Sequence, residues 1–498
     1  MNHQRTRRGV LALSCTWLAS ACTPNPVDRT ECTENADCRS AFSFTWACEQ
    51  DTGFCVEQEL PARCGKSYPE DLRDNPEAYK DHIILGALNS FTQHMDTLQA
   101  TELAVRQVNE NGGLEGQKYA MLHCDYESDE NIDMVDGLTD IEAVEQVAPF
   151  LADVVGVPAI IGPRGSSRTE ATYNAVRDLG IVVISASATS PSLTVLDTSS
   201  PTDEKPGMLW RTAPPDSLQG RVIARDVFDR DIRRVAIIHQ TGAYGDSLSA
   251  LFVSRFEELG GEDAVQFPFA QGTDFSSQVA SVAEGIRNGE YEEVLFLSSD
   301  IADYIGFVNS AVATADLEEQ FTTGLDGGIF FADASRDPQL IEGATDATVL
   351  FPKIRGSRPK SPESAEFNAF AAAYTNTFHE PIGSAFSPHA YDACWMTIYG
   401  TAWSLYQRDE ISGLGIAQGM RKLSGGEPPI VPVQPTSWST VTDAFRSGRT
   451  LDIVGASGDL DYDLSIEETS NPIEVWQIAE DPENSLGWDF VEITVVEP

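Results

Sequence analysis

The chain has 498 residues, enough for two or three domains of ordinary size. Apolar residues make up 41% of it, which supports real hydrophobic cores, while 77 acidic residues against 33 basic ones give a formal net charge of −44. So acidic a surface repels nucleic acid, and the composition therefore argues against a nucleic-acid partner.

Residues 1–21 are typical of an export signal peptide. Arginines near the start precede a short apolar stretch, residues 10–21, that is too short to cross a bilayer. The stretch ends in Leu-Ala-Ser-Ala-Cys, which resembles a bacterial lipobox with Cys22 as the lipidated residue, although Ala19 stands where the box prefers leucine. We predict an exported protein of the periplasm or cell surface, anchored in the membrane by lipidated Cys22 through a tether, residues 22–31.

The cysteines that follow indicate a small disulfide module at residues 32–64. An exported protein can oxidise its cysteines, and the absence of a C-x-x-C spacing disfavours zinc. We expect two disulfides within the module, with their connectivity left open, and a further one from the end of the module to Cys124. Cys394 is expected to be a buried free thiol. The cysteines considered for disulfides are Cys32, Cys38, Cys48, Cys55, Cys64 and Cys124.

From residue 82 the pattern changes to alternating strands and helices. We expect strands at 83–88, 119–123, 159–162 and 181–185, with helices at 98–109, 141–151 and 167–179 between them. Repeated β-α units predict a parallel sheet with helices on both faces.

The alternation restarts after an interruption rich in proline and aspartate at 197–209. The second series consists of helices at 218–228, 247–259, 275–287 and 304–313 and strands at 235–239, 264–268 and 293–297. The fold class is therefore α/β, with two doubly wound parallel sheets in succession. A mostly helical block and two late strands (474–478 and 490–496) follow, and 356–363 and 425–440 are expected to be surface loops.

Several motifs occur together and in order. They are Glu102 to Gly116, Ile160-Ile161-Gly162-Pro163 with Ser166-Ser167, Ser187-Ala188-Thr189-Ser190-Pro191, Tyr244-Gly245-Asp246, Asp274-Phe275-Ser276, Tyr391-Asp392-Ala393 and Gly455-Ala456-Ser457-Gly458. In this arrangement the chain resembles the type I periplasmic binding proteins, in particular the branched-chain amino-acid (Leu/Ile/Val) binding proteins, over about residues 80–480.

The resemblance implies two lobes joined by a hinge of three chain crossings. Lobe I would comprise 80–212 and 350–455, and lobe II 213–349 and 456–498. The implied function is capture of a small ligand, an amino acid or a similar compound, by closure of the lobes, for uptake through the permease of an ABC transporter. A ligand sensor or a surface interaction protein without a transporter is the alternative.

An α-amino acid offers a carboxylate and an ammonium group, and a closed site must satisfy both charges. The carboxylate suits a helix N-terminus and nearby hydroxyls beyond the carboxyl ends of parallel strands. In lobe I the residues in such places are Ser166, Ser167, Ser187, Ala188 and Thr189. Ordinary N-capping by serine and threonine is the structural alternative.

For the other half of the ligand, the resemblance implies Tyr244, packed over the α-carbon, and Asp326, facing the ammonium group. A surface aromatic and a turn residue beside glycines are the alternative interpretations. Gln93 occupies a position where relatives often carry an aromatic residue. Either Phe91 takes the place of that aromatic, or the side-chain pocket is more polar, which argues against a branched-chain ligand.

Other function classes lack their motifs. The sequence has no G-x-S-x-G, H-E-x-x-H, Walker A or G-x-G-x-x-G, so we expect neither an enzyme nor a cofactor. The acids at alternate positions of 459–463 suggest calcium, but Leu464 and Ser470 stand where a calcium loop needs glycine and an acid. We therefore expect no metal site.

Overall fold

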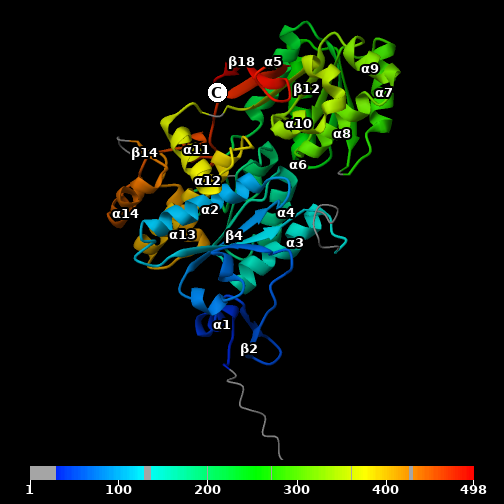
Figure 1. Ribbon diagram of the computed structural model, residues 1–498. Coiled ribbons are helices and arrows are strands. Elements are labelled where there is room, and N and C mark those ends of the chain that lie inside the picture. The colour runs from blue at the N-terminus through cyan, green and yellow to red at the C-terminus, as the bar shows by residue number, and fades with distance from the viewer. Residues whose placement is uncertain (1–29, 128–135, 199, 271, 361, 426–429) are drawn as a thin grey trace, which may run out of the picture.

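The structure is a computed structural model that describes residues 30–498 except 128–135, 199, 271, 361 and 426–429 (Figure 1). The expected signal peptide, Cys22 and most of the tether lie outside the described residues. Two α/β lobes and a small amino-terminal module follow one another along the molecule, with the module at the end of lobe I that is remote from lobe II. No helix among the described residues is long and apolar enough to cross a membrane.

The amino-terminal module is a short helix, α1 (Asn35–Ala41), beside a hairpin, β1 (Trp46–Glu49) and β2 (Phe54–Glu57). Disulfides join Cys32 to Cys48 and Cys38 to Cys55, and a third, Cys64–Cys124, ties the segment after the module to the first sheet. Four cysteines form most of the module's small core, so cross-links supply what the few buried side chains cannot.

One arginine docks the module on lobe I. The guanidinium of Arg39 donates hydrogen bonds to the carbonyl oxygens of Asp153 (2.6 Å) and Val154 (3.1 Å), at the end of the π-helical turn η4 (Phe150–Val155). A cation at a helix carboxyl end satisfies free carbonyls and the helix dipole together.

Lobe I contains a six-stranded sheet in the order β3-β5-β4-β6-β7-β8, in which only the edge strand β3 is antiparallel to its neighbour. The strands are β3 (Lys66–Tyr68), β4 (Ile83–Asn89), β5 (Tyr119–Asp125), β6 (Ala159–Ile161), β7 (Val182–Ser185) and β8 (Leu209–Arg211). Successive residues of β4 enter different cores on the two faces, so the sheet is buried on both sides.

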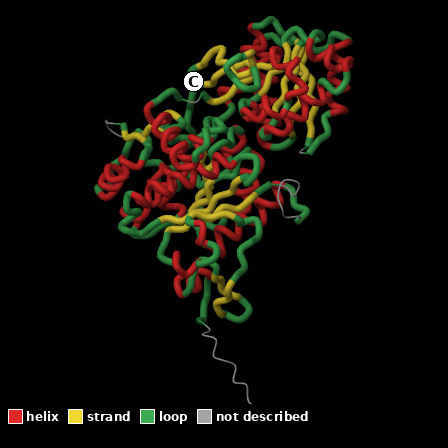
Figure 2. Tube along the Cα trace, in the orientation of Figure 1, coloured by secondary structure: helices red, strands yellow, loops and turns green. Residues whose placement is uncertain are grey.

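Helices cover both faces of this sheet (Figure 2). Those of lobe I are α2 (Met95–Glu110), α3 (Asp140–Pro149), α4 (Ser166–Val176), α11 (Ala365–Phe378), α12 (Ser387–Arg408), α13 (Gly413–Met420) and α14 (Trp438–Arg446). The long helix α12 packs against α2 and α13, and its buried Cys394 is the one free cysteine among the described residues.

Lobe II contains a seven-stranded sheet in the order β10-β9-β11-β12-β13-β17-β18. Strand β17 runs antiparallel to both of its neighbours, β13 and β18. The strands are β9 (Arg234–Gln240), β10 (Asp263–Phe269), β11 (Glu293–Leu297), β12 (Gly328–Phe331), β13 (Ile354–Pro359), β17 (Ile473–Glu480) and β18 (Trp488–Val496). Its helices are α5 (Ser217–Asp229), α6 (Ala243–Leu259), α7 (Ser276–Arg287), α8 (Ile301–Ala311), α9 (Ala315–Thr322) and α10 (Pro338–Gly343).

The strand pairing places two lobe boundaries, expected after residues 349 and 455, at other positions. The first half of the expected loop at 356–363 belongs to strand β13, which pairs with β12, so lobe II extends to residue 359 instead of ending at 349. The segment after 455 stays with lobe I, because β15 (Ile453–Gly455) pairs with β16 (Gly458–Asp459) and Tyr462 lies in the lobe I core. The chain passes between the sheets three times: after β8, after β13 and before β17.

Candidate functional site

The loops that follow the parallel strands of the two sheets meet at the cleft between the lobes. Lobe I contributes the loops after β6 and β7, and lobe II those after β9, β11 and β12. Open α/β sheets bind ligands at the carboxyl ends of their strands, so this is the place where the fold itself predicts a site.

The lobe I hydroxyls expected to bind a carboxylate have partners within the protein. Ser166 Oγ accepts a hydrogen bond from the backbone N–H of Ser190 (3.1 Å), and Ser187 Oγ accepts one from Gly165 (3.2 Å). Thr189 Oγ1 donates to Asp216 Oδ2 (2.9 Å) at the first crossing. These bonds hold the two loops together, and Ala188 between them is fully buried.

Ser167 contacts the opposite lobe. Its Oγ accepts a hydrogen bond of 3.0 Å from the backbone N–H of Ala243, at the N-terminus of α6. Two more hydrogen bonds cross the cleft, from Ser190 Oγ to Ser247 Oγ (2.8 Å) and from Gln339 to the carbonyl of Gln93 (3.2 Å). The lobes are therefore in contact through their strand-end loops, as a closed binding protein requires.

Lobe II brings Tyr244 to the cleft but not Asp326. Tyr244, in the first turn of α6, is buried and its hydroxyl donates to Asp333. Asp326 is exposed and precedes β12, whereas the cleft lies at the carboxyl end of that strand. The structure therefore places Asp326 away from the cleft, where the sequence led us to expect it. Asp333, two residues after the strand and 4% exposed, is the acid at the cleft.

Arg164 is a cleft residue that the sequence analysis missed. It lies in the loop after β6 and is 8% exposed. Its Nη1 donates to Ser384 Oγ (2.8 Å), and its guanidinium lies 5.3 Å from the centre of the Phe386 ring. Within the described part of the chain, no carboxylate lies within ion-pair distance of Arg164. A buried cation without an anion is costly, which indicates that the anion comes from outside.

Two further buried polar atoms near Arg164 have no hydrogen-bond partner among the described residues: His94 Nδ1 and the Tyr126 hydroxyl. Burial, together with the charges of Arg164 and Arg168, lowers the pKa of His94 well below its usual value, so its ring is neutral at pH 7. Buried polar groups normally find partners, and unpaired ones beside an unpaired cation fit a site that a ligand completes.

Arg168 links the lobes on one flank of the cleft. Its guanidinium pairs with Asp140 of its own lobe (2.6 Å) and with Asp300 of lobe II (2.8 Å), and lies 4.9 Å from the Tyr126 ring centre. All these side chains are buried or nearly so. Although burial acts in the opposite direction, Arg168 lowers the pKa of Asp300. Beside this pair is a cavity of about 180 Å³, lined from both lobes and including Ser167 and Gln240.

The acids of the cleft are held in an environment that disfavours their charge. Burial raises the pKa of Asp333 to about 6, against which the Tyr244 hydrogen bond acts. Burial, and then the charge of Asp333, raises the pKa of Asp216 well above its ordinary value. A cation placed beside Asp333 would favour its ionised form and lower its pKa.

Comparison with known proteins supports this picture. A family model described as periplasmic binding protein matches residues 90–437. The chain is 25% identical to the chemotactic signal transduction system substrate-binding protein BasB of Halobacterium salinarum, over 77% of this chain and 81% of that protein. It is also 25% identical to the Leu/Ile/Val-binding protein homolog 1 of Brucella suis, over 67% of this chain and 78% of the relative.

The fold is also that of a solved binding protein. The structure resembles a leucine binding protein, LivK, of Thermotoga maritima with a TM-score of 0.61 and 16% identity, over 84% of this chain and 99% of LivK. The lobe architecture is thus shared over the whole of LivK, while the module at residues 32–64 lies before the matched family segment.

Proposed function

The chain belongs to the periplasmic binding protein family, and we propose that it captures an amino acid or an amino-acid-like compound by closing its two lobes around it. Proteins of this family are extracytoplasmic solute-binding proteins and not enzymes.

The observation that carries the ligand class is the pair of opposite charges at the cleft. Among the described residues, Arg164 of lobe I has no carboxylate within ion-pair distance and Asp333 of lobe II has no cation within that distance, although the charge of Arg164 acts on Asp333 from further away. A zwitterion with a carboxylate toward Arg164 and an ammonium group toward Asp333 would satisfy both. The ring of Tyr244, whose hydroxyl is bonded to Asp333, would pack against the carbon between them.

The residues first considered take different parts in this proposal. Ser187 and the N-terminus of α4 at Ser166 can still offer a backbone N–H or a second lone pair to the carboxylate. Thr189 and Ala188 shape the loop between β7 and the hinge, and Ser167 joins the lobes after closure.

The test is a thermal-shift screen of the soluble chain from residue 23 against α-amino acids and matched compounds lacking either charged group. A ligand at 100 times its Kd should stabilise the protein by about 2.7 kcal/mol, a shift of several degrees. The expected result is a shift with an amino acid and none with its decarboxylated amine or its deaminated acid. An equal shift with the deaminated acid would show that Asp333 does not bind an ammonium group.

We further propose that lipidated Cys22 anchors the protein and that it delivers its ligand to an ABC transporter. Growth of cells on the identified ligand, with and without this gene, tests delivery. Incorporation of a tagged fatty acid that Cys22→Ser abolishes tests the anchor.

A sensing role is the second candidate, because BasB is named as part of a chemotactic signal transduction system and its match covers 77% of this chain. The docked module of residues 32–64 would hold the lobes in a fixed orientation for a signalling partner. Unchanged growth together with a lost response to the ligand would favour sensing over uptake.

A further inference from the structure

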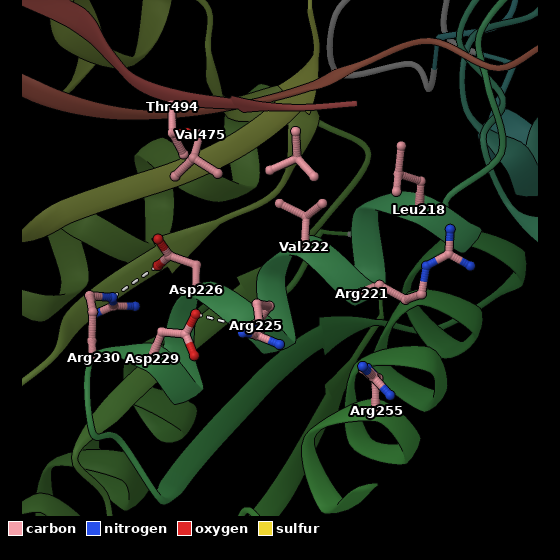
Figure 3. A pocket seen from close by; sticks show the side chains of 11 residues that line it. Leu218, Arg221, Val222, Arg225, Asp226, Asp229, Arg230, Arg255, Val475 and Thr494 are labelled. Carbon is pink, nitrogen blue, oxygen red and sulfur yellow. Dashed lines mark hydrogen bonds and ion pairs between the residues drawn. The ribbon is translucent and has the colours of Figure 1, made fainter. Parts of the chain in front are cut away.

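A second cavity, remote from the cleft loops, lies on lobe II between helix α5 and strands β17 and β18 (Figure 3). It has a volume of about 450 Å³, within the range of small-molecule sites. β18 is the edge strand of the lobe II sheet, and residues of β17, β18 and α5 line the cavity together. We call this cavity the α5–β18 groove.

The floor of the groove is apolar. Val475 and Thr494 on the strands face Leu218 and Val222 on the helix across an open space (Figure 3). Val496 completes this floor, and Val475 and Val222 are buried while the others are partly accessible. The accessible apolar surface of the floor comes from Leu218 and Val496, and an apolar group that covers it gains free energy.

The rim of the groove carries arginines together with two carboxylates, Asp226 and Asp229, which are paired with Arg230 and Arg225. Arg225 is paired with Asp229 (2.8 Å) and Arg255 with Glu258 (2.7 Å), both as exposed pairs of little strength. Arg221 is exposed, and within the described ranges no carboxylate lies at ion-pair distance from it. Arg221 is therefore available to an anion from solution, and Arg255 can exchange its weak exposed partner for one.

We propose that the α5–β18 groove binds a single-chain aliphatic carboxylate, with the tail on the floor and the carboxylate at Arg221 and Arg255. Both parts of such a ligand match what the groove offers. A second copy of this chain fits less well, because two strongly acidic molecules repel one another and the floor is recessed between helix and sheet. This site is independent of the proposed cleft ligand.

Isothermal titration calorimetry of the soluble chain from residue 23, with hexanoate and octanoate below their micelle concentrations, tests the proposal. We expect octanoate to bind more tightly by roughly fourfold for each added methylene, which corresponds to about 0.8 kcal/mol per buried CH₂. Arg221→Glu and Arg255→Glu should each weaken octanoate binding by roughly tenfold. Arg287→Glu, an arginine of α7 that is also exposed and ion-paired, is the matched control and should change nothing.

Three results would overturn the proposal: no binding of octanoate, equal binding of octylammonium, or the same loss with Arg287→Glu. Octanoate binding that Arg164→Ala abolishes would place the ligand in the cleft and would also refute the groove. Because an amino acid at the cleft is measured separately by thermal shift, failure of one site leaves the test of the other intact.

Discussion

The two lobes bring opposite charges to the cleft. Lobe I contributes the buried cations Arg164 and Arg168 and several hydroxyls that are already bonded within the protein. Lobe II contributes carboxylates, among them Asp300 and Asp333. Closure thus brings positive side chains of lobe I to negative side chains of lobe II. The two arginines differ in whether the protein itself supplies their carboxylate partners.

Arg168 finds its carboxylates inside the chain, and Arg164 finds none among the described residues. The first arrangement can hold the lobes together without a ligand, whereas the second favours closure only once an anion is present. A binding protein needs both: contacts that define the closed geometry, and a charge that stays uncompensated until the ligand arrives. The predictions below test this division, from the largest expected effect to the smallest.

The largest effect is expected from removing the carboxylate that Arg168 meets in its own lobe. Asp140→Asn removes the anion that Arg168 meets in its own lobe, so the buried guanidinium keeps a partner, Asp300, only while the lobes are closed. We expect the free energy of unfolding to fall by about 3–5 kcal/mol, measured by urea denaturation.

Asp300→Asn breaks the pair of the same guanidinium across the cleft and serves as the comparison. Because the lobes can separate and let water reach Arg168, the loss of unfolding free energy should be smaller, and the radius of gyration by small-angle X-ray scattering should rise. Equal stability losses for both variants, with no change in the radius of gyration, would refute a cross-cleft role for Asp300.

The next effect concerns ligand affinity. Once an amino-acid ligand is identified, Asp333→Asn should weaken its binding by about 2–5 kcal/mol, because the ammonium group would lose its only expected anion in a buried place. Calorimetry measures this loss. Asp326→Asn is the matched control in the same segment, and since Asp326 is exposed at the other end of β12 it should leave the affinity unchanged.

A loss with Asp326→Asn that equals the loss with Asp333→Asn would restore the original sequence interpretation. Retained affinity in both variants would remove the ammonium site from lobe II altogether.

These two aspartates show where prediction from sequence stops. The β-α alternation predicted both sheets, because apolar runs separated by amphipathic helices leave few alternatives. The short strand Gly328–Phe331 was missed, since the glycines before it favour a turn, and without that strand nothing says which acid lies at its carboxyl end. Had the strand been recognised, the tendency of open α/β sheets to bind ligands at the carboxyl ends of their strands would have selected Asp333 over Asp326.

Strand β13 was missed for a tertiary reason. Its Gly356 and Pro359 are poor strand formers, and 356–363 therefore resembled a loop. In the structure the indole of Trp476 packs against Gly356, where a Cβ atom would meet the ring at 2.2 Å. A glycine that makes room for a residue 120 positions away leaves no local signal. The same applies to Arg164, which is important because no carboxylate among the described residues pairs with it.

The smallest effect is a pH dependence of ligand affinity, which arises from the lobe II carboxylate and not from the lobe I arginine. The pKa of Asp333 is raised by burial to about 6, so below pH 6 a proton competes with the ligand's ammonium group. Affinity should fall about tenfold between pH 7 and pH 5, while Arg164 and the ligand carboxylate keep their charges.

Stability of the unliganded protein should change in the opposite direction. A raised folded-state pKa contributes stability that is fully present below the unfolded value near 3.8 and is lost as pH rises through 6. Burial also raises the pKa of Asp337 to about 6, and that of Asp216 well above its ordinary value, so these groups add to the stability trend. Asp337→Asn should therefore reduce the pH dependence of stability and leave that of ligand affinity intact. If Asp337→Asn abolished the pH dependence of affinity instead, the anion that meets the ligand would be Asp337, and the lobe II half of the site would lie one turn further along the chain.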